Sequence, residues 1–160
     1  MVATTGGFDA APFDGPRPMR MDEVAASERL MRLAFGGPEP EDEAGVLARY
    51  VPPQQGGMRV IAHAGRLVAQ IDTFHDLLRV YDGEIRVGSV GGVCTHPDYR
   101  GRRLAGRLME YCAQELVDDG ANLLLISGGR GLYTRLGNVP HGRFLSFAIT
   151  PPQSEQLPAA

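Results

Sequence analysis

A change of hydrophobic period at Pro97 divides the chain into two kinds of predicted structure. Between Arg59 and Thr95 apolar and polar residues alternate, which predicts strands, and the dipeptides Ala64-Gly65 and Asp82-Gly83 are typical of tight hairpin turns. After Pro97 the apolar residues recur at intervals of three and four, which predicts a long amphipathic helix through Leu104, Ala105, Leu108, Met109, Cys112 and Leu116. We therefore expect an antiparallel meander of three strands that leads into a helix.

The residues on either side of this region complete the expected fold. Gly120 ends the helical pattern, and the apolar run from Ala121 to Ile126 is typical of a fully buried strand in a parallel pair. Asp22 to Phe35 predicts a helix before the meander, and Glu41 to Tyr50 predicts a weaker one. The expected fold class is α/β, in the α+β sense, with a mixed sheet and helices on both faces.

The end of the chain predicts a short helix at Arg130 to Leu136, which Gly137 closes in the left-handed conformation, and one last strand at Gly142 to Ile149. A single strand at this point leaves a sheet edge exposed. A longer polypeptide, a partner subunit in a homodimer, or an early end of the fold would each account for that edge.

Length and composition indicate one soluble domain. A chain of 160 residues fits a single domain that buries roughly 70% of the surface of its unfolded form. We expect this domain at residues 18–150, with a flexible tail at 1–17 and a second tail at 151–160. The start of the chain does not have the pattern of a secretion signal, and the longest apolar run, Leu123 to Ile126, is far below the roughly 20 residues that cross a bilayer. A cytoplasmic protein without membrane contact is expected.

Several chemistries are excluded by residue type. All 16 basic residues are arginine, which excludes a Schiff-base lysine and a phosphate-loop lysine. A net charge of -3 argues against general nucleic-acid binding. Cys94 and Cys112 lack paired metal-ligand spacing, so we expect two reduced thiols, no disulfide and no metal.

The segment from Val93 to Ala105 carries the most informative chemistry. It joins a strand to a helix through a turn that contains Arg100, Arg102 and Arg103, and glycines at Gly91 and Gly92 precede it. Arginines at the positive end of a helix are unfavourable unless an anion lies among them, and a phosphate is such an anion. A solvated helix face is the alternative. The glycines indicate a bulge, a close approach of ligand or backbone, or a twisted strand end.

This segment resembles the acyl-coenzyme A signature of the GNAT superfamily of N-acetyltransferases, Arg/Gln-x-x-Gly-x-Gly/Ala, which matches at Arg100 to Ala105. The match departs at Arg103, where the family has glycine. The order of the predicted elements is similar to that of the family from Asp22 to Gly137. The runs Gly-Gly-Val-Cys-Thr-His-Pro and Gly-Leu-Tyr-Thr-Arg-Leu-Gly look most like the Eis-type branch.

The resemblance implies an enzyme that transfers acetyl from acetyl-coenzyme A directly to a small-molecule or peptide amine, without a metal. Backbone groups of Val93, Cys94 and Thr95 would pair with the pantetheine arm. The residues that would hold the pyrophosphate are Arg100, Gly101, Arg102, Arg103, Leu104 and Ala105. Tyr133 would be the general acid that protonates the departing thiolate.

The base that deprotonates the amine is open at this point, because the family's usual glutamate is missing. Asp72, His75, His96 and the distant Glu84 are candidates, as is a water chain. A nucleophilic Cys94 is an alternative to direct transfer. Two other classes are a non-catalytic acyl-coenzyme A module and, less favoured by the acidic balance, an arginine-rich RNA-binding domain.

Overall fold

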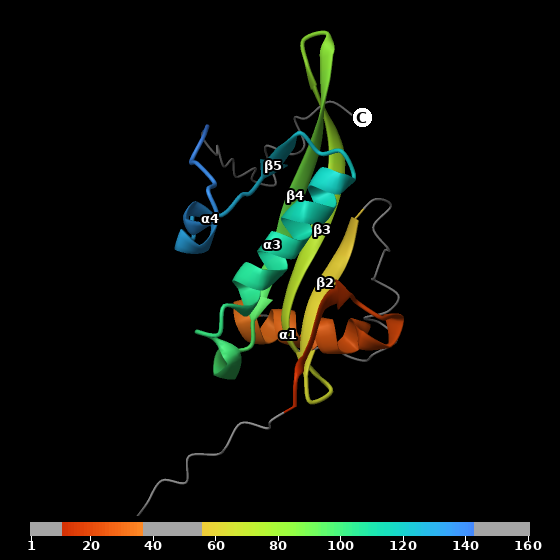
Figure 1. The fold of residues 1–160 in the computed structure, drawn as a ribbon, viewed down its shortest axis with the longest axis vertical. Helices are drawn as coiled ribbons and strands as arrows, with labels where there is room; N and C mark the ends of the chain where they lie inside the picture. The colour runs from red at the N-terminus through yellow and green to blue at the C-terminus, as the bar shows by residue number, and fades with distance from the viewer. Residues whose placement is uncertain (1–10, 37–55, 143–160) are drawn as a thin grey trace, which may run out of the picture. The chain divides into compact units, whose positions relative to one another are not determined.

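The computed structural model describes residues 11–36 and 56–142 (Figure 1). The chain divides into two compact units, Met1–Gly128 and Gly129–Ala160. The predicted helix at 41–50 and the predicted last strand from Gly142 onward lie outside the described residues, apart from Gly142 itself, as does the C-terminal tail. None of the described helices is long and apolar enough to cross a membrane.

The first unit is built on a five-stranded sheet in the order β1-β2-β3-β4-β5 (Figure 1). The strands are β1 at Phe13–Pro18, β2 at Gly56–His63, β3 at Arg66–Val80, β4 at Gly83–Thr95 and β5 at Leu123–Leu125. Neighbouring strands run antiparallel from β1 to β4, and β4 pairs with β5 in parallel. The expected meander and parallel strand are confirmed, and the sheet is mixed.

Strand β1 corrects the expectation of a flexible tail at residues 1–17. Phe13 pairs with His63 and Pro18 pairs with Arg59, so the segment forms an edge of the sheet. Its glycine and prolines, Gly15, Pro16 and Pro18, are residues that resemble a loop in sequence but are tolerated on an edge strand. Residues 1–10 lie outside the described part.

Both predicted hairpins are present, and one differs in register. Ala64 and Gly65 have φ values of 47° and 74°, which is the two-residue turn that their types predict. In the second hairpin Val80 pairs with Gly83, so the turn residues are Tyr81 and Asp82, with a φ of 53° at Tyr81. The prediction of a turn at Asp82-Gly83 was therefore wrong by one residue, because Gly83 joins the ladder.

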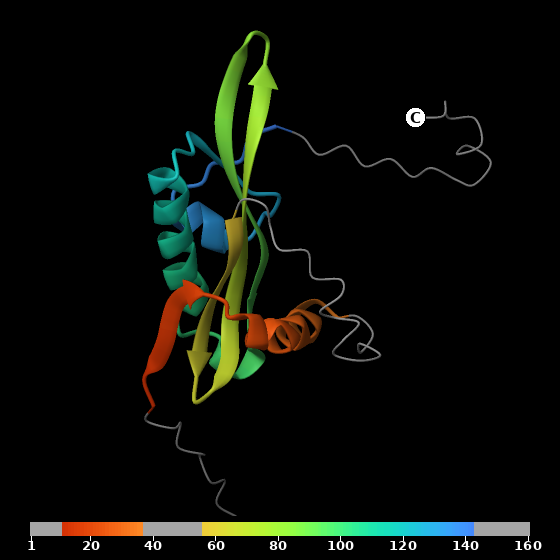
Figure 2. The ribbon, with the colours of Figure 1, turned by 90° about the vertical axis from the view of Figure 1, so that its right-hand side faces the viewer.

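Helices cover both faces of the sheet, as expected (Figure 2). A 3-10 turn η1 at Met21–Glu23 leads into α1 at Val24–Phe35, which contacts β3 and β4. Helix α3 at Leu104–Asp118 lies on the opposite face and contacts β2, β3 and β4. Its buried stripe is close to the predicted one and consists of Leu104, Leu108, Met109, Cys112 and Leu116.

Helix α3 ends in the cap that Gly120 predicts. Gly120 has a φ of +88° and donates to the carbonyl of Val117, while Ala121 donates to the carbonyl of Leu116. Strand β5 follows, but the expected full burial was wrong. Leu123 and Leu125 are 40% and 47% exposed, because β5 is short and has no described strand on its outer side.

The second unit contains the short helix α4 at Gly131–Arg135. Gly137, with a φ of +86°, donates to the carbonyl of Thr134, and Asn138 donates to the carbonyl of Tyr133, both at 3.1 Å. This confirms the predicted short helix and its left-handed glycine end.

Candidate functional site

A bulge interrupts β4 at its paired glycines. Gln70 pairs with Cys94 and Asp72 pairs with Gly91, so two steps along β3 correspond to three along β4. Gly92 carries a φ of +56°, and a Cβ there would meet the Met31 sulfur at 3.3 Å. A bulge is one of the alternatives that the glycines indicated. It bends β4 and so changes the direction of the residues that follow.

Beyond this point β4 is open on one edge. The ladder with β5 runs only from Val87 to Ser89, whereas β4 continues to Thr95. In the described part of the chain, no strand pairs with that edge of β4 from Val90 to Thr95. An extended ligand that pairs with β4 would therefore lie along this edge.

The side chains of this stretch are used by the core. Val93 and Cys94 are 6% and 4% exposed. Cys94 belongs to the apolar cluster under α1, and its Sγ lies 4.0 Å from Sδ of Met31. It is a core thiol and has the wrong environment for a nucleophile, which must reach the substrate. Cys112 is also buried, and burial raises the pKa of its thiol to about 12.

The turn after β4 leads to the start of α3, where several backbone amides have no acceptor among the described residues. It runs through the short helix η2 at Pro97–Tyr99 and two left-handed residues, Gly101 with a φ of +78° and Arg103 with a φ of +60°. Arg103 is the N-cap of α3 and its side chain makes no capping bond. Within the described residues, the amides of Leu104 to Gly106 donate to no acceptor, so they and the helix dipole present a positive site.

The departure at Arg103 therefore has a conformational meaning. A glycine would adopt the left-handed region freely, whereas an arginine there costs of the order of 1 kcal/mol or more. Arg103 thus places a charged side chain at a backbone position that favours glycine.

The four arginines of this region have different surroundings. Arg102 stands over the ring of Tyr99, with 5.5 Å from its Cζ to the ring centroid. Arg107 donates from Nη2 to the carbonyl of Gly15 at 3.0 Å. Arg100 and Arg103 are exposed and have no carboxylate partner among the described residues. These two are the charges available to an anion.

An aromatic cluster anchors the turn, and sequence reasoning did not find it. The ring of Tyr99 packs edge-on against His96 and His63, with centroids 5.7 Å and 5.5 Å apart, and its hydroxyl lies 3.2 Å from Nδ1 of His63. Phe13 of β1 lies against His63. His63 therefore has a structural role. The cluster joins residues from β1, β2 and the turn, and no local pattern brings them together.

Both ring nitrogens of His96, a candidate base, are in contact with neighbouring residues. It is 6% exposed, its Nε2 lies 2.6 Å from Nη2 of Arg66, and its Nδ1 accepts the Asp98 amide at 3.3 Å. Burial, and after it the charge of Arg66, lowers the pKa of His96. Glu84 is paired with Arg79 at 3.1 Å, and His75 lies 3.5 Å from Asp119.

Asp72 differs from the other candidates because it lies beside the bulge. Its pair partners are Gly91 and Met58, and Met58 packs against the cluster under α1, so the register places Asp72 on that face of the sheet. Burial raises the pKa of Asp72, and the Thr73 backbone and Arg59 oppose this shift only in part. Tyr133 lies in α4 of the second unit, is buried, and accepts at its carbonyl from Nδ2 of Asn138.

A family model for an acetyltransferase (GNAT) domain matches residues 16–138. The chain belongs to the GNAT acetyltransferase family. The matched residues run from β1 to the end of α4 and include the bulge, the turn and Tyr133. The predicted family and fold are confirmed, and the similarity to the Eis-type branch stays a prediction.

Solved structures share this fold at low identity. A Trypanosoma brucei acetyltransferase is 19% identical with a TM-score of 0.69, covering 82% of this chain and 96% of its own. An Arabidopsis thaliana glucosamine-6-phosphate N-acetyltransferase is 12% identical with a TM-score of 0.70, covering 87% and 99%. The aminoglycoside N-acetyltransferase AAC(6')-Iy in complex with CoA is 14% identical with a TM-score of 0.70, covering 88% and 96%. Among curated proteins no relative matches.

Proposed function

We propose that this GNAT protein is an N-acetyltransferase that passes acetyl from acetyl-coenzyme A to an amine. The observation that carries the proposal is the open edge of β4 from Val90 to Thr95, which runs into the unpaired amides at the start of α3. An extended amide-bearing arm followed by a diphosphate fits that sequence of donors. We further propose that residues 18–150 with β1 form one catalytic domain, that it works in the cytoplasm, and that a homodimer partner covers the exposed edge.

In this proposal the cosubstrate is held mainly by backbone. Val93, Cys94 and Thr95 pair with the pantetheine arm, and the burial of the Val93 and Cys94 side chains is consistent with this. The amides of the segment from Arg100 to Ala105 hold the pyrophosphate. The exposed side chains of Arg100 and Arg103 add charge-assisted hydrogen bonds.

The transfer is direct. The amine nitrogen attacks the thioester carbonyl, a C–N bond forms, and collapse of the tetrahedral intermediate breaks the C–S bond. The phenol of Tyr133 gives its proton to the leaving thiolate, and a base takes one proton from the amine. The core environment of Cys94 supports this route over an acetyl-enzyme.

We assign the base to Asp72. It lies next to the β4 bulge, has no ion-pair partner among the described residues, and its raised pKa makes it a stronger base than an ordinary aspartate. His75, His96 and Glu84 each face a charged neighbour already. The acceptor is proposed to be a small-molecule or peptide amine. Two of the structural neighbours are named for amino-sugar acceptors, which agrees with the small-molecule class.

Calorimetry and a thiol-release assay test the proposal together. Acetyl-coenzyme A should bind the wild type, and Arg100→Gln should weaken binding by at least about tenfold, as expected for a charge-assisted hydrogen bond. Arg79→Gln, at the far hairpin, is the matched control and should bind normally. Free thiol should appear only when an amine from a panel is added. Binding without amine-dependent thiol would favour a non-catalytic acyl-coenzyme A module, and no binding at all would end both proposals.

A further inference from the structure

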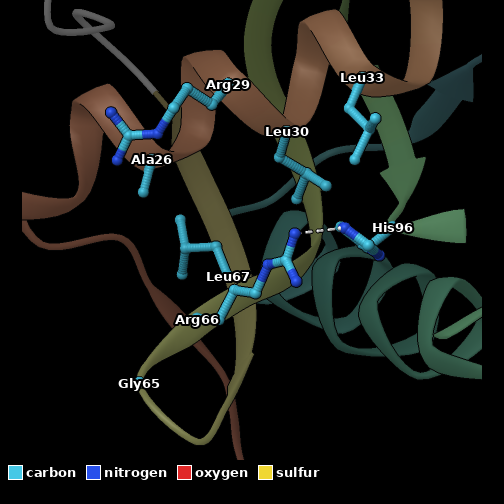
Figure 3. A pocket seen from close by; sticks show the side chains of 8 residues that line it. All are labelled: Ala26, Arg29, Leu30, Leu33, Gly65, Arg66, Leu67 and His96. Carbon is cyan, nitrogen blue, oxygen red and sulfur yellow. Dashed lines mark hydrogen bonds between the residues drawn. The ribbon is translucent and has the colours of Figure 1, made fainter. Parts of the chain in front are cut away.

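A cavity lies on the α1 face, and it reaches His96, the residue that follows β4 (Figure 3). Its volume is about 330 Å³. It lies between α1 and the turn that joins β2 to β3, and its lining residues are Ala26, Arg29, Leu30, Leu33, Gly65, Arg66, Leu67 and His96. Figure 3 shows Leu30 pointing from α1 toward the guanidinium of Arg66 and the ring of His96. The acetyl-transfer proposal gives this cavity no role.

The lining has two chemical halves. Ala26, Leu30, Leu33 and Leu67 supply aliphatic surface, whereas Arg29 and Arg66 supply positive charge. Among the described residues that line the cavity, none has an acidic side chain. A ligand that fits must therefore combine an apolar body with an anionic group.

Arg66 has an unusual partner. Its guanidinium meets Nε2 of His96 at 2.6 Å, and within the described residues it has no carboxylate at ion-pair distance. An imidazole nitrogen leaves the charge of Arg66 uncompensated. The guanidinium has four further N–H donors, and no hydrogen bond joins them to another described residue.

A second donor competes with Arg66 for the ring of His96. The backbone N–H of Asp98 points at Nδ1 of the same ring, at 3.3 Å. A neutral imidazole has one acceptor nitrogen and a protonated one has none, so two donors compete for one lone pair. The Asp98 carboxylate, 3.7 Å from Nδ1, is too distant to relieve this by a hydrogen bond. An acceptor supplied to Arg66 from the cavity would free the ring to accept from Asp98.

We propose that this cavity binds a small organic monocarboxylate, with its carboxylate on the Arg66 fork and its aliphatic or aromatic body against Leu30 and Leu67. A carboxylate matches the planar fork with two parallel hydrogen bonds, and the cavity lies at the small end of the range for ligand pockets. The proposal is independent of acetyl transfer.

Titration with hexanoate, followed by amide chemical shifts of the full chain, tests the site. Hexanoate should shift Gly65, Leu67 and His96. Affinity should rise about fourfold for each methylene from butanoate to hexanoate, as burial of aliphatic surface predicts. Arg66→Gln should weaken binding by at least about tenfold. Arg79→Gln should leave it unchanged. Both side chains are exposed, so neither variant threatens the fold.

Three outcomes would overturn the proposal. Equal binding of hexanamide would show that charge has no part in recognition. Equal binding of hexanoate to Arg66→Gln would move the carboxylate elsewhere. Binding of inorganic phosphate but not hexanoate would make this a simple anion site with no role for its apolar half.

Discussion

Two glycine-to-alanine changes should move stability in opposite directions and so test the backbone of the proposed pyrophosphate turn. At both Gly101 and Gly106 an added Cβ meets no atom within 4 Å, so crowding contributes to neither change. The difference lies in the backbone, because Gly101 has a φ of +78° whereas Gly106 is in the first turn of α3.

The magnitudes follow from those conformations. An alanine held in the left-handed region costs roughly 1–2 kcal/mol, of which about 0.4–1 kcal/mol is offset because alanine restricts the unfolded chain. Gly101→Ala should therefore destabilise by up to about 1.5 kcal/mol. Gly106→Ala should stabilise by about 0.5–1 kcal/mol, because glycine is a poor helix former. The melting temperatures should separate by several degrees, at about 2–4 °C per kcal/mol for a protein of this size.

Urea denaturation of the two variants provides the measurement, with the slope m as the check that the unfolded state is unchanged. Gly101→Ala should also lower acetyl-coenzyme A affinity by calorimetry, since the turn must shift to relieve the strain, while Gly106→Ala retains every amide. If Gly101→Ala stabilises the protein as much as Gly106→Ala, the left-handed turn is not present in solution and the reasoning fails.

Three further predictions concern the titrating groups and the general acid. Tyr133→Phe should lower turnover with little effect on acetyl-coenzyme A affinity, and an unchanged rate across the pH range would remove Tyr133 from the chemistry. Asp72→Asn should abolish the rise of the rate with pH. It should also stabilise the fold at pH 7, as measured by urea denaturation. The pKa of Asp72 is raised on folding, so the free energy of unfolding falls as pH rises from the pKa of the unfolded state to that of the folded state. The pKa of His96 is lowered on folding, which gives the opposite pH dependence: stability should fall as pH drops below about 6.5. Arg66→Gln should reduce the loss of melting temperature between pH 7 and pH 5, because it removes a charge that lowers this pKa. An unaltered loss would contradict the prediction.

The sequence predicts most of the elements that carry the site, because their patterns are local. The alternation before Pro97, the helical repeat after it and the helix ends at Gly120 and Gly137 each depend on neighbouring residues, and all three are confirmed. The family signature at Arg100 to Ala105 is local in the same sense, and the family it indicates is confirmed.

The features that were missed depend on contacts between distant residues. Arg66 meets His96 across 30 positions, and that contact is what withdraws His96 from the candidate bases. Strand β1 depends on pairing with β2, which outweighs the low strand propensity of its glycine and prolines. The exposure of Leu123 and Leu125 reflects the neighbours that β5 has or lacks, and an apolar run alone does not report them.

The prolines of β1 have a consequence for how copies of this protein meet. Met19 donates inward to the carbonyl of Met58 at 2.9 Å, so by alternation the hydrogen that Pro18 lacks is the one that would point away from the sheet. An incoming strand would find no backbone donor at Pro18 on that side. Pro18 therefore disfavours the addition of a further strand from another molecule at this edge of the sheet.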